Sequence, residues 1–121
     1  MTPDAFRAAA MSLPGVSEHA LMDTLTYRVR HKGFATIGWP EAGWAVVKLS
    51  RQEQLRLMRQ SHALAVEPGV RGKRGVTLIR LSVLEPDIAA DVLSAAWREV
   101  YGPGDRAVAA AATTALAGLQ L

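Results

Sequence analysis

The sequence contains no cysteine. This absence excludes disulfide bonds, thiolate nucleophiles and metal sites built on sulfur ligands, and it fits a reducing compartment. The N-terminus has no basic segment followed by a long apolar run, so no secretory signal is expected, and the cytoplasm is the expected location. The most apolar stretch, residues 107–121, is too short and too rich in alanine to span a bilayer, which needs about 20 apolar residues. No membrane association is expected.

Residue patterns that would indicate catalysis or metal binding are also missing. His19, His31 and His62 do not stand at ligand spacing from one another or from a pair of carboxylates. No serine lies in a nucleophile-elbow motif. The glycine-containing segment 67–75 has arginine where a phosphate-binding loop requires serine or threonine, and no helix follows it directly. We therefore expect no catalytic residue, no metal and no cofactor, and we predict that the protein is not an enzyme.

The composition that is present is that of a globular domain. Half of the residues are hydrophobic and 21% are charged, which is a composition that can form a hydrophobic core. A chain of 121 residues is long enough for one domain and too short for two. The net charge is only +3, but residues 28–80 contain eleven Lys or Arg and three acids, whereas the rest contains three Lys or Arg and eight acids. Clustered cations are compatible with a basic face that neutralises the phosphates of a polyanion. A solvated surface explains the same charges, so their convergence in space stays open.

The first half of the chain predicts one helix followed by a meander of strands. The Thr-Pro-Asp sequence at residues 2–4 is typical of a helix start, and the Pro-Gly pair at 14–15 ends that helix. Three runs of alternating side chains then follow, joined by short turns as in an antiparallel sheet: residues 25–30, 34–39 and 44–49. Residues 19–23 fit either a helical turn or a short edge strand.

The second half predicts further helices around one strand. Ser50 with Glu53 is a capping box that opens a helix over residues 51–62. The side chains of that helix expected to face inward are Leu55, Met58 and His62. Another helix begins at Pro86 and ends before the Gly-Pro-Gly sequence at 102–104. A last helical segment in the tail could pack on the core, form a dimer contact or fray.

Residues 67–84 combine a basic loop with an apolar strand. The loop, residues 67–75, carries three cations among three glycines, which allow backbone angles that other residues avoid. In the strand that follows, one face is predicted to be buried: Thr77, Ile79, Leu81 and Val83. Arg80 interrupts the apolar row of the opposite face, which indicates that this face is open to solvent beside the basic loop.

The predicted fold class is therefore α+β. We expect an antiparallel sheet of about four or five strands, covered on one face by the N-terminal and C-terminal helices. Residues 1–102 would form the single domain, and residues 103–121 a C-terminal helical tail that is a candidate homodimer contact.

The order of several motifs resembles the MmcQ/YjbR family of small bacterial proteins. The resemblance covers residues 4–101. It rests on segments 6–16 with Glu18, 27–29, 32–36, 46–50, and 72–75 running into Arg80-Leu81. The resemblance implies a frataxin-like α+β domain, described as a double-wing DNA-binding shape, with no catalytic residues assigned. The chain departs from the family pattern at Val76, where an aromatic residue is common, and in the tail after Gly102.

Eight cations are the candidate nucleic-acid-binding residues: Arg28, Arg30, Lys32, Lys48, Arg71, Lys73, Arg74 and Arg80. Basic hairpin tips can act as wings that straddle a groove, because arginine forks match phosphate oxygens and glycines let the backbone approach closely. No recognition helix or set of base-reading side chains is visible. We therefore predict a non-enzymatic domain that binds DNA weakly and largely independently of sequence, through phosphate contacts.

A second class of function fits the same sequence. A cleft on the sheet face, near Trp44, Arg80 and the basic loop, would suit a partner protein or a small ligand. Trp39 and Trp44 flank a turn and are candidates for partial exposure, whereas Trp97 lies on an apolar helical stripe and is expected in the core. The salt dependence of the affinity distinguishes the two classes of function, because phosphate binding weakens steeply as salt rises and apolar binding changes little.

Overall fold

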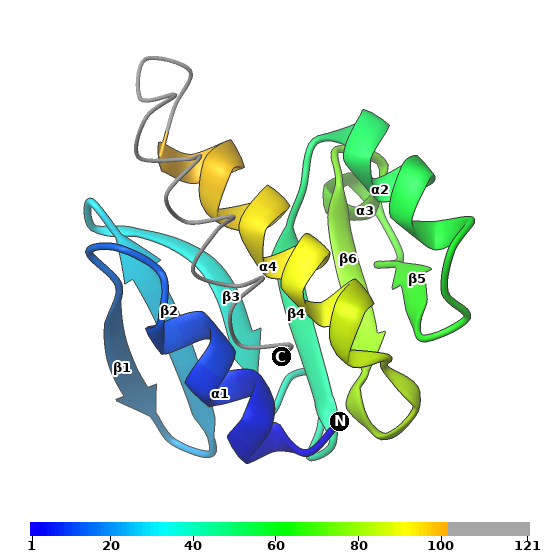
Figure 1. Ribbon diagram of the computed structural model, residues 1–121. Helices are drawn as coiled ribbons and strands as arrows, with labels where there is room; N and C mark the ends of the chain where they lie inside the picture. The colour runs from blue at the N-terminus through cyan, green and yellow to red at the C-terminus, as the bar shows by residue number, and fades with distance from the viewer. Residues whose placement is uncertain (102–121) are drawn as a thin grey trace.

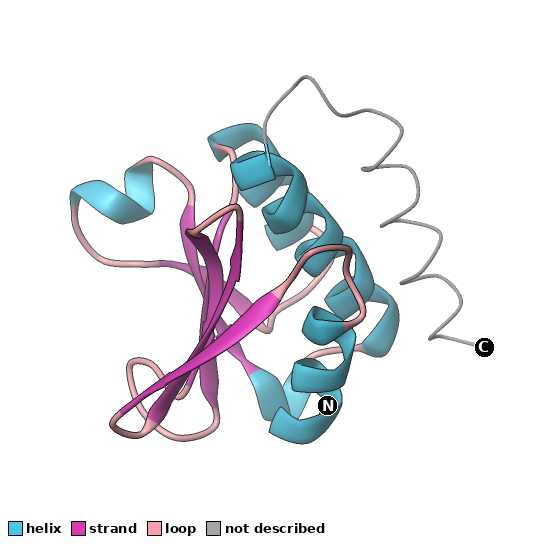
Figure 2. Ribbon diagram, turned by 90° about the vertical axis from the view of Figure 1, so that its left-hand side faces the viewer, coloured by secondary structure: helices cyan, strands magenta, loops and turns pink. Residues whose placement is uncertain are grey.

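The computed structural model describes residues 1–101 and has an α+β fold built on one six-stranded antiparallel sheet (Figure 1). The elements along the chain are α1 (Pro3–Met11), β1 (Ser17–Leu21), β2 (Thr24–Val29), β3 (Lys32–Ile37), β4 (Trp44–Lys48), α2 (Arg51–Met58), β5 (Leu64–Val66), α3 (Val70–Lys73), β6 (Val76–Arg80), the 3-10 turn η1 (Leu81–Val83) and α4 (Pro86–Tyr101). Helices α1 and α4 lie over one face of the sheet, as predicted for the N-terminal and C-terminal helices (Figure 2).

The strands have the order β1-β2-β3-β4-β6-β5, which confirms the predicted meander from β2 to β4. The expected number of four or five strands is wrong, because the sheet has six. The two strands that the sequence did not define are the edges: β1 pairs only with β2, and β5, three residues long, pairs only with β6. Four of the five residues of β1 are exposed, so this edge strand has no apolar alternation that would reveal it.

The two long helices begin and pack as their sequences predict. At the start of α1 the backbone N–H of Ala5 donates to the Thr2 hydroxyl at 3.1 Å. Trp97 in α4 is fully buried, and its indole N–H donates to the Pro14 carbonyl at 3.0 Å. The core position predicted for Trp97 is therefore confirmed, and the turn after α1 is tied to α4.

A polar cluster links α1 to the first two strands. Tyr27 on β2 is buried, and its hydroxyl donates to the Glu18 carboxylate at 2.8 Å. Arg7 on α1 donates twice to the same carboxylate, at 2.6 and 2.9 Å. The hydrogen bond from Arg7, with a smaller one from Tyr27, lowers the pKa of Glu18. Burial and the bond to Glu18 raise the pKa of Tyr27 above its usual range.

Helix α2 begins at the predicted cap but presents a different side to the core. The backbone N–H of Glu53 donates to the Ser50 hydroxyl at 3.1 Å, as the capping box requires. The helix ends at Met58 rather than at His62, and its buried side chains are Gln54 and Leu57. Of the predicted inward stripe, Met58 is partly buried against the core, whereas the prediction is wrong for Leu55 and His62, which are exposed. The spacing of apolar residues did not predict which side of α2 is buried, because one of its two buried residues, Gln54, is polar.

Strand β6 is shorter than the predicted 76–84. Its neighbour β4 begins opposite Arg80, at Trp44, so no strand remains for the chain to pair with beyond Arg80. The chain therefore leaves the sheet in η1. Of the predicted buried face, three residues are buried as expected: Thr77, Ile79 and Leu81. Val83 is 51% exposed because it lies in η1 and not in the strand.

The tail helix and the homodimer contact predicted for residues 103–121 fall outside the residues that the structure describes. Within residues 1–101, no helix is long and apolar enough to cross a membrane.

Candidate functional site

The segment between β5 and β6, residues 67–75, contains the short helix α3 and is held close to the sheet by two glycines. A Cβ atom at Gly72 would lie 1.6 Å from the carbonyl oxygen of Glu67. Gly75 has a φ of +114°, and a Cβ atom there would lie 1.9 Å from the carbonyl oxygen of Leu49. Neither position has room for a side chain. The glycines thus fix the segment that carries three of the candidate cations.

Gln54 anchors this segment from the helix-covered side of the sheet. Its side chain is fully buried. The amide nitrogen donates to the carbonyl oxygens of Gly72, at 3.0 Å, and Val76, at 3.1 Å, and to the Thr77 hydroxyl at 3.0 Å. Its amide oxygen accepts a hydrogen bond from Arg51. One buried side chain therefore joins α2, α3 and β6.

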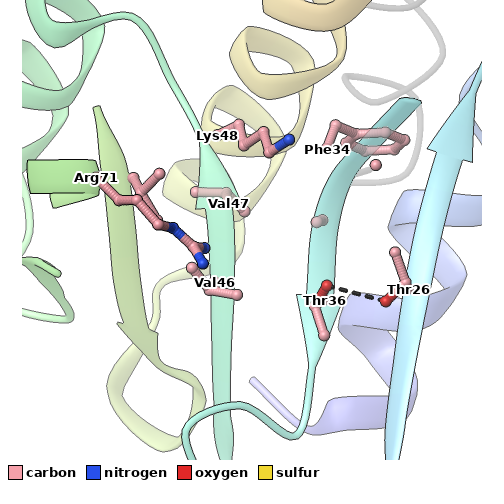
Figure 3. A pocket seen from close by; sticks show the side chains of 10 residues that line it. Thr26, Phe34, Thr36, Val46, Val47, Lys48 and Arg71 are labelled. Atoms are coloured by element: carbon pink, nitrogen blue, oxygen red, sulfur yellow. Dashed lines mark hydrogen bonds between the residues drawn. The ribbon is translucent and has the colours of Figure 1, made fainter. Parts of the chain in front are cut away.

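The sheet face opposite α1 and α4 is called the open face here, because among residues 1–101 the one helix on that side is α3 (Figure 2). A hollow of about 190 Å³ lies on it, the open-face hollow. Arg71 extends from α3 toward Val46 on β4, and Lys48 lies at the end of the same strand (Figure 3). The hydroxyls of Thr26 and Thr36 form a hydrogen bond of 3.1 Å on the opposite side of the hollow.

A second hollow of about 360 Å³ lies at the end of the sheet where β4 and the α3 segment meet α4. Three candidate cations line this end hollow: Lys32, Lys48 and Arg74. Glu99 of α4 lines it as well. Lys48 belongs to both hollows, so the two form one continuous basic region, called the basic end below.

The charges of the basic end are only partly neutralised within the described residues. Arg71 pairs with Glu67 through its Nε atom at 3.1 Å. No ion pair is found within residues 1–101 for Lys32, Lys48 or Arg74. These three cations are thus available for an anion that approaches from solvent.

The other four predicted site residues do not line either hollow. Arg28 is exposed on the open face opposite Gly33, which lines the open-face hollow, and Lys73 is exposed on α3. Arg30 lies over the Tyr101 ring at 3.9 Å, on the side of α4. Arg80 lies over the Trp44 ring at 5.0 Å, at the far end of β4 from Lys48. The structure therefore brings four of the eight predicted cations together and leaves Arg30 and Arg80 apart from them.

The sequence predicts neither Gln54 nor the Thr26–Thr36 pair as part of the site. Gln54 stands three residues before Leu57, so a buried stripe through Leu57 would have included it. The threonines alternate with buried residues on β2 and β3, but only the register of the two strands shows that they face each other. Within residues 1–101, no three His, Asp or Glu side chains are grouped to hold a metal ion.

A family model described as YjbR matches residues 11–99, a range that includes all eight candidate cations and Gln54. No curated protein matches the chain.

Proposed function

We propose that this chain, which belongs to the YjbR family, is a non-enzymatic domain that binds nucleic acid through phosphate contacts at the basic end. The observation that carries the proposal is the position of Lys48 between the two hollows. Arg71 lies on one side of it, and Lys32 and Arg74 on the other. Cations from β3, β4 and the α3 segment thus share one surface, which is the arrangement that phosphate neutralisation requires.

The chemistry of the basic end favours phosphates over bases. Arginine and lysine donate to phosphate oxygens without reading sequence, and the basic end offers no asparagine or glutamine that could pair with base edges. The β2–β3 hairpin and the α3 segment would act as two wings on either side of Lys48. We therefore propose weak binding of DNA, largely independent of its sequence, with no cofactor.

A second candidate function rests on the open-face hollow. Its lining combines apolar side chains such as Val46 and Val76 with the two threonine hydroxyls, which suits a small ligand. Such a ligand would be held mostly by burial, so its affinity would change little with salt. Phosphate binding would weaken steeply over the same range.

The test is fluorescence anisotropy with a labelled duplex of random sequence over a series of salt concentrations. Lys48→Gln removes the central cation, and Arg59→Gln is the matched control, because Arg59 is an exposed residue that follows α2 on the helix-covered side. Lys48→Gln should weaken binding and reduce the slope of log affinity against log salt by about 0.9, the value for one lost contact to duplex DNA.

The control should keep the wild-type slope. An absence of binding at low salt, or equal losses for the two variants, would refute the proposal. Tight binding that ignores salt would favour the small-ligand alternative.

A further inference from the structure

We infer that the open face prefers a single strand to a duplex, with phosphates at Lys48 and Arg71 and a base stacked at the Trp44–Arg80 pair. This inference rests on the proposed function and names its substrate class. It uses a feature that phosphate binding at the basic end leaves unexplained: an aromatic ring with a cation stacked on it, at the opposite end of the same sheet face.

The register of the sheet places these groups on one line. Ala45 and Val47 belong to the core, so Trp44, Val46 and Lys48 face the other way, on the open face. Trp44 and Lys48 are therefore about 14 Å apart along β4. Arg80 pairs with Trp44 on the neighbouring strand and shares that face. A chain lying along β4 could contact the aromatic pair and the basic end at once.

The Trp44–Arg80 pair has the properties of a stacking platform. The Arg80 guanidinium lies 5.0 Å from the centre of the Trp44 ring, and Arg80 is exposed. Trp44 is half-buried and is not part of the hydrophobic core. Trp39 is 49% exposed, and the residue before it donates its backbone N–H to the Trp44 carbonyl at 2.8 Å, so the backbone of Trp39 follows close to that of Trp44. Indole rings and guanidinium planes both stack on nucleic-acid bases.

The surface between the two ends favours a single strand. Cross-strand pairing places the partly exposed Thr36 and Leu78 on either side of the buried Val46, and none of these three side chains is charged. A duplex keeps its bases stacked inside and would offer the Trp44–Arg80 pair only backbone. A single strand can turn its bases toward the sheet while its phosphates reach Lys48 and Arg71.

The experiment compares a labelled oligothymidylate of about 12 nucleotides, within the about 4–16 that one OB-fold domain covers, with a duplex of the same length at one salt concentration. The wild type should bind the single strand at least about tenfold more tightly. Trp44→Leu should lose about tenfold in single-strand affinity and little in duplex affinity, whereas Trp44→Phe keeps a stacking ring and most of the affinity. Urea unfolding checks that both variants stay folded, as expected for a residue outside the core.

The control Arg59→Gln should leave the preference unchanged, and Arg80→Gln should reduce it. Equal affinities for both probes, or a Trp44→Leu variant that binds the single strand like the wild type, would overturn the inference and leave the proposed function standing. A wild type that binds neither probe would overturn both.

Discussion

Gln54→Ala should lower the free energy of unfolding by about 2–4 kcal/mol, although the residue is polar and lies on a surface helix. The amide group carries two hydrogens, and three acceptors lie within 3.1 Å of its nitrogen. Alanine removes two or more buried hydrogen bonds, each worth about 0.5–1.5 kcal/mol net, while the carbonyl oxygens of Gly72 and Val76 each keep one backbone donor, from Gly75 and Glu67. A small cavity adds to the loss.

Urea unfolding followed by circular dichroism measures this change. With a slope of about 2 kcal/mol per molar urea, the midpoint should fall by about 1–2 M. Gln52→Ala is the matched control, because Gln52 lies on the same helix and is exposed, and its change should stay within about 0.5 kcal/mol. If the two variants unfold at the same urea concentration, the assignment of Gln54 as the anchor of the α3 segment is refuted.

Gln54→Glu tests the same geometry through pH. The substitution replaces the donating amide nitrogen by a carboxyl oxygen that faces three acceptors, so only the protonated acid can donate there. Burial and the three acceptors should therefore raise the pKa of the new carboxyl above its unfolded value of about 4.3, and Arg51, which donates to the other side-chain oxygen, should limit that rise. The variant should be most stable below that pH and lose stability as pH rises toward the folded pKa, relative to the wild type. A constant difference between the two proteins across this range would contradict the hydrogen-bond assignment.

Two further predictions concern the glycines and the Glu18 cluster. Gly72→Ala should lower the urea midpoint strongly and weaken duplex binding, because the new Cβ would meet the Glu67 carbonyl. The control is Gly33→Ala, whose Cβ would lie 3.4 Å from Thr26 and whose urea midpoint should stay close to that of the wild type. Equal midpoints for the two variants would contradict the close packing of the α3 segment. The lowered pKa of Glu18 means that its contribution to stability is present above about pH 4.3 and is lost as pH falls through the folded pKa. Glu18→Gln should therefore flatten the acid side of a plot of urea midpoint against pH, and parallel plots for the two proteins would argue against the Arg7–Glu18 bond.

The parts of the fold that the sequence predicted are those with local signals. The caps at Thr2 and Ser50, the helix starting at Pro86 and the short turns of the β2–β4 meander each depend on residues close in the chain. The edge strands were different, because β1 is mostly exposed and β5 is short, and neither carries a buried alternating face. The rotation of α2 depends on the Gly72 and Val76 carbonyls, which come 18 and 22 residues after Gln54, and no local pattern records them.

The sequence predicted that the candidate site would be made of cations, but not which of those cations lie together. Alternation placed Arg80 correctly on the open face, but β6 runs from Val76, beside Lys48, to Arg80 at the opposite end. Arg30 lies in a turn with a φ of +52°, and its side chain lies on the Tyr101 ring, on the side of α4. Charge and glycine content identify cationic segments, whereas the direction of each strand decides which ends meet.

The strand order β4-β6-β5 has a consequence for the way the chain folds. Strands β1 to β4 each pair with the strand next to them in sequence, so they can assemble by closing short loops, which carries a small entropic cost. β5 pairs only with β6, so it joins the sheet through β6, and the pairing of β4 with β6 must close the longer loop that contains α2, β5 and α3. The N-terminal amino group donates to the Leu81 and Leu84 carbonyls, which lie beyond β6. Docking of β6 therefore completes the sheet, secures both ends of the domain and brings Arg71 and Arg74 to Lys48. We expect the proposed nucleic-acid binding to appear only in this last step, so a partly folded meander would not bind even with most of its strands formed.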